Sequence, residues 1–397
     1  MSEGRKNFKA IEPRQRNLKE VGIGILGYGF MGKMHSTAYV KIPFQTDTAP
    51  ARPVLVAMCG RDEKKVREVA LRYGYQGYYT QWENLVTDPN IDVFDNSGPD
   101  SLHCEPCVAA AEAGKHVVCE KPFAVTVAEA RSMVEAVRRA KVKNLCGFNY
   151  RFIPAVRLAR HLIQKGVLGT LYSFNGKYLQ EWGHNPKTPV EDVWYTRGKG
   201  TGVMLGIGSH LLDVARYLVG EVTTVMGKVK THNTKRPNKA GKLEDAPADE
   251  LDAGIVEFEN GCVGILEASA ISTGRKNYMS WEISGSRGSV AFNLEDLNHL
   301  QVYLDEGAMQ EVMGFSNVSV TESLHPYANM AWAPGHNIGW ESAIIYELFH
   351  FIDAVANDTP VGPDAATFED GFKNQYLMEL LKQASREGKK LEVDYQL

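Results

Sequence analysis

A run of glycines near the N-terminus has the spacing that binds a phosphate group. Residues Gly27–Gly32 follow G-x-G-x-x-G, directly after the apolar run Val21–Leu26 and before the helical pattern Met31–Ile42. In this context the first glycine permits a tight turn, the second lets the backbone approach a pyrophosphate, and the third lets helix and strand pack closely. The helix N-terminus would then face the phosphates. The alternative is a glycine-rich turn without a ligand, but the context favours a dinucleotide site that includes Gly27, Tyr28, Gly29, Phe30, Met31 and Gly32.

The residues after the second apolar run, Val54–Met58, decide which ribose such a site accepts. They are Cys59, Gly60, Arg61 and Asp62. Arg61 could pair with a 2′-phosphate, which favours NADP, whereas Asp62 could accept hydrogen bonds from ribose hydroxyls, which favours NAD. Asp62 could also simply cap a helix. We expect NAD, with NADP as the alternative, and we include Gly60, Arg61 and Asp62 in the predicted site.

A third loop, Ser97–His103, follows the strand-like run Ile91–Asn96. In a doubly wound sheet this loop lies at the carboxyl edge, where ligands bind. Pro99 could present a flat apolar face to a nicotinamide, while Ser101 could instead cap the next helix. The loop therefore adds Ser97, Pro99 and His103 to the predicted cofactor site.

Strand and helix patterns alternate through residues 21–148, which predicts a parallel, doubly wound sheet of the Rossmann type. Between Thr223 and Val320 the pattern is mostly that of antiparallel strands separated by turn residues, such as Asn260-Gly261 and Ser286-Arg287-Gly288. Residues 233–250 are polar and contain two prolines, which predicts a mobile surface loop. Two helical patterns, Ser342–Asn357 and Phe368–Glu387, follow.

The predicted fold class is therefore α/β with two domains. An N-terminal Rossmann domain with a doubly wound parallel sheet occupies residues 21–148. A C-terminal α+β domain with a large open, mostly antiparallel sheet occupies residues 149–397 and serves substrate binding and oligomerisation. Residues 1–20 form a polar N-terminal arm.

Composition narrows the classes of function. The 397 residues are 44% hydrophobic and 23% charged, with a formal net charge of −4. This balance provides no global basic field for nucleic acid or an anionic membrane. The longest apolar stretch, Val21–Met31, is shorter than the ~20 residues that span a bilayer, and residues 1–20 lack an apolar signal segment. We therefore expect a cytoplasmic protein without a nucleic-acid or membrane partner.

The six cysteines are predicted to be reduced thiols. Cys104 and Cys107 form a C-x-x-C pair beside His103 and Glu105. No second pair stands at metal-ligand spacing, so no metal site is predicted.

Four segments together resemble one family of oxidoreductases. They are the glycine run Gly27–Gly32, Ala113–Val117, Glu120-Lys121-Pro122, and Gly206–Asp213. In this combination, and over almost the whole chain from residue 21, the sequence resembles the Gfo/Idh/MocA family. Within the family it is similar to a branch of levoglucosan and glucoside 3-dehydrogenases, on the segments Met31–Ser36, Cys59–Asp62, Phe148–Arg151 and Tyr178–Trp182.

The resemblance implies roles for individual residues. Lys121 would contact the reacting hydroxyl and the cofactor ribose, and its ammonium would stabilise a forming alkoxide. His210 would be the general base that removes the hydroxyl proton. Asp213, three residues further on the same helix face, would orient the imidazole or contact the substrate. Glu120 and Asn149 complete the implied cofactor contacts.

Aromatic and polar residues of the second domain predict a wall that binds a sugar, since aromatic faces suit the C–H faces of pyranoses. The predicted substrate-binding residues are Lys121, Tyr150, Arg151, Tyr178, Gln180, Trp182, Trp194, His210 and His336. Trp332, His336 and Trp340 form a second cluster that could close over the substrate.

One position departs from the family pattern. The family usually has aspartate four residues before the histidine, where this chain has Gly206. Three explanations are open: another carboxylate replaces the acid (Glu181, Asp192 or Asp213), the lost side chain makes room for a larger substrate, or catalysis is reduced or changed.

The resemblance implies an NAD(P)-dependent oxidoreductase that oxidises a ring hydroxyl, at C3, of a pyranose, cyclitol or glycoside. A redox glycosidase is the alternative: it would oxidise C3 transiently, eliminate the aglycone, add water and return the hydride, as a sulfoquinovosidase-like enzyme would. A nicotinamide-binding regulator with reduced catalysis is the second alternative. Family membership also implies a homodimer or homotetramer formed through the C-terminal sheet.

Overall fold

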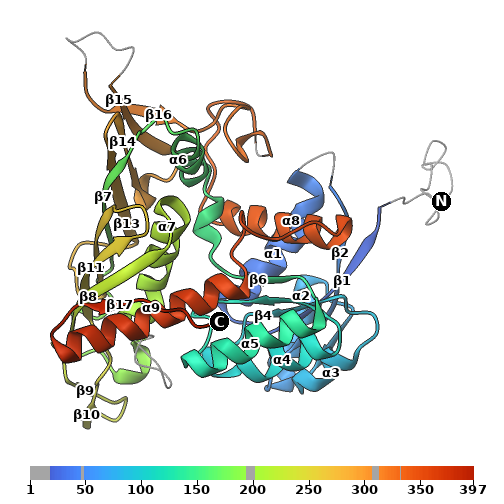
Figure 1. Ribbon diagram of the computed structural model, residues 1–397. Coiled ribbons are helices and arrows are strands. Elements are labelled where there is room, and N and C mark those ends of the chain that lie inside the picture. The colour runs from blue at the N-terminus through green and yellow to red at the C-terminus, as the bar shows by residue number, and fades with distance from the viewer. Residues whose placement is uncertain (1–17, 46–48, 194–201, 306–312, 331) are drawn as a thin grey trace.

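The computed structural model describes residues 18–45, 49–193, 202–305, 313–330 and 332–397, and two sheets organise them (Figure 1). The first sheet confirms the predicted doubly wound Rossmann sheet: its strands are all parallel, in the order β3-β2-β1-β4-β5-β6. Its strands are β1 (Glu20–Leu26), β2 (Arg52–Cys59), β3 (Gly77–Tyr79), β4 (Val93–Asn96), β5 (His116–Cys119) and β6 (Asn144–Cys146). The helices of this domain are α1 (Phe30–Gln45), α2 (Glu63–Tyr73), α3 (Trp82–Thr87), α4 (Cys104–Glu112) and α5 (Val127–Ala140).

The second sheet confirms the predicted large open sheet. Its strands lie in the order β16-β15-β14-β13-β7-β12-β11-β8-β17, and only β7 and β12 pair in parallel. The strands are β7 (Leu171–Leu179), β8 (Val222–Lys230), β11 (Leu251–Phe258), β12 (Val263–Ser269), β13 (Tyr278–Gly285), β14 (Gly288–Asn293), β15 (His299–Leu304), β16 (Ser316–Ser319) and β17 (Leu391–Glu392). The predicted turn at Asn260-Gly261 joins β11 to β12, with Gly261 at φ +83°.

The helices of the described residues cover the face of this sheet that points toward the Rossmann domain (Figure 1). They are α6 (Pro154–Gln164), α7 (Ser209–Val219) and α9 (Phe368–Glu387). Every residue of α7 is buried, because the helix lies between the sheet and the first domain. The opposite face of the sheet forms the left edge of the molecule in Figure 1.

The last two helices tie the domains together. On α8 (Ser342–Asn357), Ile344 and Phe351 join the buried cluster that contains Ile23 of β1 and Tyr39 of α1. On α9, Phe372 packs in a Rossmann-domain cluster, whereas Leu381 packs in the core of the second domain. The chain therefore returns to the first domain after building the second.

The prediction of a mobile surface loop over residues 233–250 is wrong where the chain forms a small hairpin, β9 (Lys235–Pro237) and β10 (Leu243–Asp245). Arg236 of β9 is fully buried. Its guanidinium pairs with Glu250 at 2.8 Å and donates to the carbonyl oxygens of Gly183 and Asn185. A buried charge persists only when paired, so this ion pair orders a segment whose composition predicted a loose loop.

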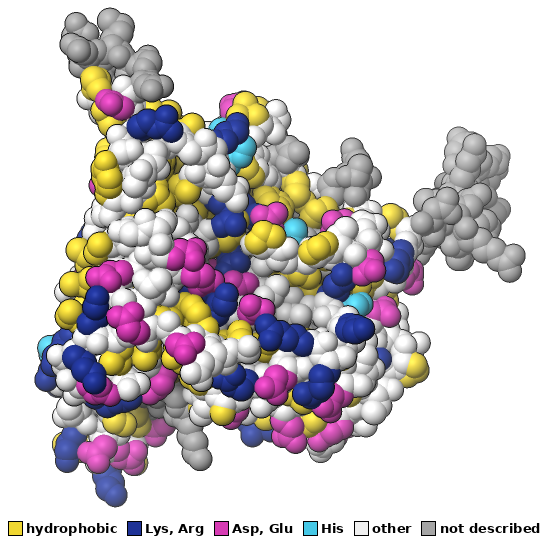
Figure 2. Space-filling view, in the orientation of Figure 1, with side chains coloured by type: hydrophobic (Ala, Val, Ile, Leu, Met, Phe, Trp, Pro, Cys, Tyr) yellow, Lys and Arg dark blue, Asp and Glu magenta, His cyan; other side chains and the backbone are white. Residues whose placement is uncertain are grey.

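Lys and Arg side chains are interspersed with Asp and Glu over the face shown in Figure 2. Across the described residues, no helix is long and apolar enough to cross a membrane. The six cysteines are free thiols, and all but Cys104 are buried.

Candidate active site

The glycine turn between β1 and α1 leaves an open cradle for a diphosphate. Gly27 has φ +105°, and a Cβ there would lie 2.7 Å from the carbonyl oxygen of Ser97. A Cβ on Gly32 would lie 2.3 Å from the carbonyl oxygen of Gly27. A Cβ on Gly29 would meet nothing within 4 Å. The turn is therefore packed on the protein side and open at Gly29, beside the N-terminus of α1, which fits a bound pyrophosphate.

Asp62, which follows β2, is the N-terminal cap of α2, the alternative to ribose binding that the sequence left open. Its carboxylate caps α2 by accepting a hydrogen bond from the Lys65 N–H at 3.0 Å. Arg61 is exposed. A Cβ on Gly60 would lie 2.1 Å from the Tyr28 ring, so the glycine makes room for that ring at the end of the strand.

Two residues of the loop after β4 that belong to the predicted cofactor site form hydrogen bonds within the protein. Ser97 donates a hydrogen bond to Asp95 at 2.9 Å. The ring nitrogens of the buried His103 lie 2.9 Å from the Pro122 carbonyl oxygen and 3.2 Å from that of Gly98. Both side chains brace the loops at the sheet edge, where Pro99 is exposed.

A cavity of about 460 Å³ lies at the carboxyl edge of the Rossmann sheet, between the two domains. This volume falls in the range of small-molecule sites. Most of the predicted catalytic and wall residues line it: Phe30, Met31, Glu120, Lys121, Asn149, Tyr150, Tyr178, Gln180, Trp182 and His210, together with Gly206. The residues that sequence reasoning did not place here are Gly147, Ile207, Lys276 and Asn277, and Trp340 joins them from the predicted second cluster.

Lys121 and His210 line the cavity together with Gly206, which stands where the family usually has an aspartate. The Lys121 ammonium donates a hydrogen bond to the carbonyl oxygen of Gly206 at 2.9 Å. The His210 ring stacks on Tyr150, with ring centroids 4.3 Å apart. Burial lowers the pKa of His210 well below its ordinary value, and the nearby Lys121 charge lowers it further. Burial also lowers the pKa of Lys121, which Glu120 partly counters. The imidazole is therefore neutral at neutral pH and able to accept a proton.

A chain of hydrogen bonds fixes the wall opposite the Rossmann domain. Trp340 Nε1 donates to the Tyr150 hydroxyl at 3.2 Å, which lies 2.9 Å from the Tyr178 hydroxyl. Tyr178 and Gln180 both donate to Asn277 Oδ1, at 2.7 and 2.8 Å. No spacing in the sequence links these residues, since Asn277 enters only through the pairing of β13 with β7.

Three buried polar atoms of residues that line the cavity have no hydrogen-bond partner within the described part of the chain: Asn149 Nδ2, Gln180 Oε1 and His210 Nδ1. A buried donor or acceptor without a partner costs about 1–3 kcal/mol. A ligand that supplies both donors and acceptors would relieve this cost.

Arg151 and Asp213, which the sequence predicted to act in the site, pair with each other outside the cavity lining. Arg151 forms two hydrogen bonds with Asp213, at 2.6 and 2.8 Å, and a third with Asp370 at 3.1 Å. Arg151 and Asp213 are almost completely buried, and neither residue lines the cavity. Both oxygens of the Asp213 carboxylate accept hydrogen bonds from Arg151, so Asp213 does not orient His210 in this structure.

The other proposed replacements for the missing acid are also engaged elsewhere. Glu181 pairs with Lys276 and accepts the Gly274 N–H, while Asp192 pairs with Lys239. His336, a predicted substrate-binding residue, is exposed, lies outside the cavity lining and bonds the Ala333 carbonyl. Trp194 lies outside the described residues.

Two carboxyl groups support the π-helical segment Met204–Gly208, which carries Gly206. Asp249 accepts the Met204 N–H at 3.1 Å and pairs with Lys382. Asp252 lies beside Asp249, and burial, followed by the Asp249 charge, raises the pKa of Asp252 to about 9. Asp252 is therefore protonated at neutral pH.

This raised pKa predicts a pH-dependent stability. Between about pH 4 and pH 9 the folded protein holds a proton on Asp252 that the unfolded chain releases, so its stability contribution declines as pH rises. Replacing Asp252 by asparagine removes that decline. Relative to wild type, the free energy of unfolding of Asp252→Asn should rise by roughly 1–3 kcal/mol between pH 5 and pH 8. Urea unfolding at both pH values measures it, and an equal difference at both would contradict the assignment.

A glycine cradle on a parallel sheet, joined to an open-sheet domain across a cavity that holds a lysine and a histidine, defines a two-domain dinucleotide-dependent oxidoreductase. Residues 21–148 match the oxidoreductase family with an NAD-binding Rossmann fold, and residues 156–291 match the GFO/IDH/MocA C-terminal domain. The chain belongs to the Gfo/Idh/MocA family, and its first domain is an NAD-binding Rossmann domain.

Relatives of known activity are sugar and polyol dehydrogenases. Levoglucosan dehydrogenase of Pseudarthrobacter phenanthrenivorans is 36% identical over 370 residues, which cover 90% of this chain and 94% of that protein. Myo-inositol 2-dehydrogenase of Thermotoga maritima is 29% identical over 62% of this chain and 68% of its own length. A solved levoglucosan dehydrogenase in complex with NADH and L-sorbose is 35% identical with a TM-score of 0.91, over 95% of this chain and all of that one.

Proposed function

We propose that this protein is an NAD-dependent dehydrogenase that oxidises a ring hydroxyl, at C3, of a pyranose, cyclitol or glycoside. The observation that carries the proposal is the set of three buried, partnerless polar atoms on Asn149, Gln180 and His210. Adjacent hydroxyl groups, each both donor and acceptor, match one free N–H group, one free carbonyl oxygen and one imidazole nitrogen. The aromatic wall of Tyr150 and Trp182 suits the C–H face of the same ligand.

In the proposed reaction, His210 takes the proton of the hydroxyl that is oxidised. Its imidazole is held by stacking on Tyr150 and is neutral, so it is a competent base. The Lys121 ammonium stabilises the oxygen as negative charge develops on it. The Gly206 carbonyl holds that ammonium with a neutral dipole in place of the usual charged acid. Bound NAD supplies the nicotinamide that accepts the hydride from the ring carbon.

The redox glycosidase remains the second candidate because of Gly206. None of the three proposed replacement acids is free to serve His210, so the site departs from the Lys/Asp/His set. Transient oxidation at C3 would acidify the proton on C2, so that elimination could expel the aglycone. Water would then add and the hydride would return to C3, with no net redox change.

One assay with two readouts tests both candidates. The protein is mixed with NAD and a panel of levoglucosan, inositols and chromogenic glycosides, including charged sugars, while reduced nicotinamide and released aglycone are followed together. Stoichiometric reduction with an intact oxidised sugar supports the dehydrogenase. Aglycone release without net reduction contradicts it and supports the glycosidase. NAD binding with neither product overturns both and favours a regulator.

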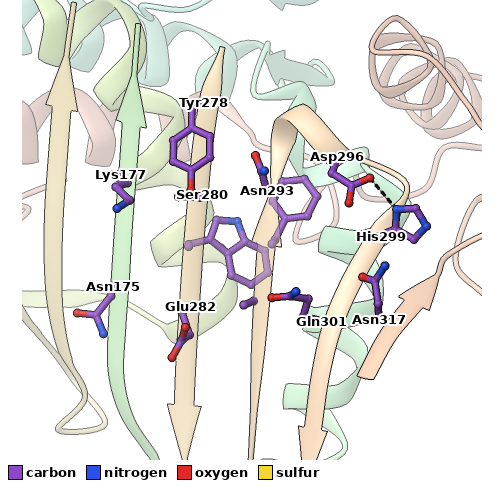
Figure 3. Close-up of a pocket in the computed structure, with 13 residues that line it drawn as sticks. Asn175, Lys177, Tyr278, Ser280, Glu282, Asn293, Asp296, His299, Gln301 and Asn317 are labelled. Carbon is purple, nitrogen blue, oxygen red and sulfur yellow. Dashed lines mark hydrogen bonds and ion pairs between the residues drawn. The ribbon is translucent and has the colours of Figure 1, made fainter. Parts of the chain in front are cut away.

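We also propose that the open face of the nine-stranded sheet forms a homodimer or homotetramer. Met226, Ile255 and Ile265 are neighbours across β8, β11 and β12, and each is 45–55% exposed. Beside them, Figure 3 shows polar side chains on β7, β13 and β15, including Lys177, Glu282 and Gln301, along a basin of about 430 Å³. Sedimentation should give a dimer or tetramer that Ile265→Lys dissociates, whereas a monomeric wild type would contradict the proposal.

A further inference from the structure

A buried imidazole lies directly behind the floor of the cavity. His35, on α1, has no exposed surface. Its Nδ1 lies 2.8 and 3.0 Å from the two carboxylate oxygens of Asp95, and its Nε2 lies 3.1 Å from Glu120 Oε1. A neutral imidazole has only one N–H group, so it can donate to only one of two carboxylates. Two carboxylate partners therefore require the imidazolium.

Glu120 connects this imidazole to the reacting groups. Its second oxygen accepts the backbone N–H of Lys121 at 3.0 Å, while its carboxylate lies against Gly147, where a Cβ would stand 2.7 Å from Oε1. Glu120 and Lys121 both line the cavity. The orientation of this carboxylate is thus set by the His35 ring, the Lys121 backbone and the Gly147 backbone.

The charges of the cluster balance only with a protonated His35. The anions Asp95 and Glu120 stand against the cations His35 and Lys121. Burial alone would lower the pKa of His35, but the two carboxylates outweigh it and raise that pKa well above its usual value. Two further titratable groups interact with this cluster: burial, followed by the Glu120 charge, raises the pKa of Glu347 on α8, and burial, followed by the Asp95 charge, raises that of Tyr39.

We propose that His35 is a positioning residue for the reaction: as an imidazolium between Asp95 and Glu120, it holds the Glu120 carboxylate turned away from the Lys121 ammonium. This proposal rests on the function proposed above for Lys121. Without the imidazolium, the Glu120 carboxylate loses its partner and pairs with the neighbouring Lys121 ammonium. This pairing moves that ammonium away from the Gly206 carbonyl and from the developing alkoxide.

The kinetic test uses His35→Gln, Glu120→Gln and the double variant, with a substrate identified by the assay above. His35→Gln should lower kcat by about tenfold or more and change KM less than about threefold, because the ground-state contacts of the sugar remain. The double variant should be no slower than Glu120→Gln alone, since His35 acts through that carboxylate. Multiplicative losses would overturn the proposal.

Tyr39→Phe is the matched control for a merely structural role. Tyr39 donates to the same buried Asp95 at 2.7 Å but does not contact Glu120. This variant should lose stability and keep its kcat. A tenfold loss of kcat in Tyr39→Phe would show that any disturbance of the cluster suffices, which overturns a specific role for His35.

An NMR titration of His35 tests the proposal without the need for enzyme turnover. The imidazole nitrogen shifts of His35 in 15N-labelled protein should show the doubly protonated ring at pH 8 in wild type, and a ring that loses its proton at lower pH in Glu120→Gln. A neutral ring at pH 7 in wild type would overturn the proposal. If no sugar is turned over, the proposed function fails, while this titration still decides whether the imidazolium exists.

Discussion

Replacing Lys121 by methionine is expected to lower kcat/KM by about 10³-fold while changing NAD affinity by less than about threefold. The methionine keeps the length of the side chain but removes the charge that lies 2.9 Å from the Gly206 carbonyl. That charge matters most when the alkoxide forms, so its loss falls mainly on the transition state. Steady-state kinetics and NAD titration by protein fluorescence measure the two quantities separately.

The same variant predicts a shift in pH dependence. The Lys121 charge lowers the pKa of His210, so removing it raises that pKa, and the acid limb of the kcat/KM profile should move to higher pH. Lys276→Met is the matched control, because Lys276 also lines the cavity but is exposed and paired with Glu181. It should cost less than about fivefold, since no step depends on its charge. An equal loss in both lysine variants, or an unmoved acid limb, would remove Lys121 from its proposed role.

The first domain could be predicted from the sequence because its signals are local. The glycine turn, the apolar runs and the helix patterns are each contained in about ten residues, and parallel strand order follows from their alternation. The pieces that escaped prediction were β3 and α3, which are three and six residues long. Elements this short carry too few residues for a period to show.

The site was predictable only where a motif stands at the end of a strand or the start of a helix. Lys121 and His210 lie in the cavity because β5 and α7 deliver them there. Arg151 and Asp213 have equally suggestive residue types, yet they bond one another, and a sequence does not show which of several charges are neighbours. The positions of Asn277 and His35 beside the site were not predicted for the same reason. The hydrogen-bond partners of Asn277 are about 100 residues away in the sequence, and those of His35 are 60 and 85 residues away.

The role of the Arg151–Asp213 pair predicts a large effect on stability and a small one on catalysis. Arg151→Met leaves the Asp213 carboxylate buried without its main partner, which should lower the free energy of unfolding by about 3–5 kcal/mol. In Arg151→Met/Asp213→Leu both charges are gone, so most of that loss should be recovered. Asp370 keeps Arg216 as a partner in either variant. Denaturant unfolding of the single and double variants measures the difference.

Steady-state kinetics of the double variant then separate a structural role of the Arg151–Asp213 pair from the substrate binding that the sequence predicted for Arg151. Because neither residue lines the cavity, the double variant should keep kcat and KM within about threefold of wild type per folded molecule. A residue that holds a sugar hydroxyl through a charged hydrogen bond would instead raise KM by about tenfold or more when removed. A stable double variant with a raised KM would therefore support a direct contact between Arg151 and the substrate. An unchanged KM would leave recognition to the aromatic wall and to Asn149 and Gln180, which line the cavity and carry partnerless polar atoms.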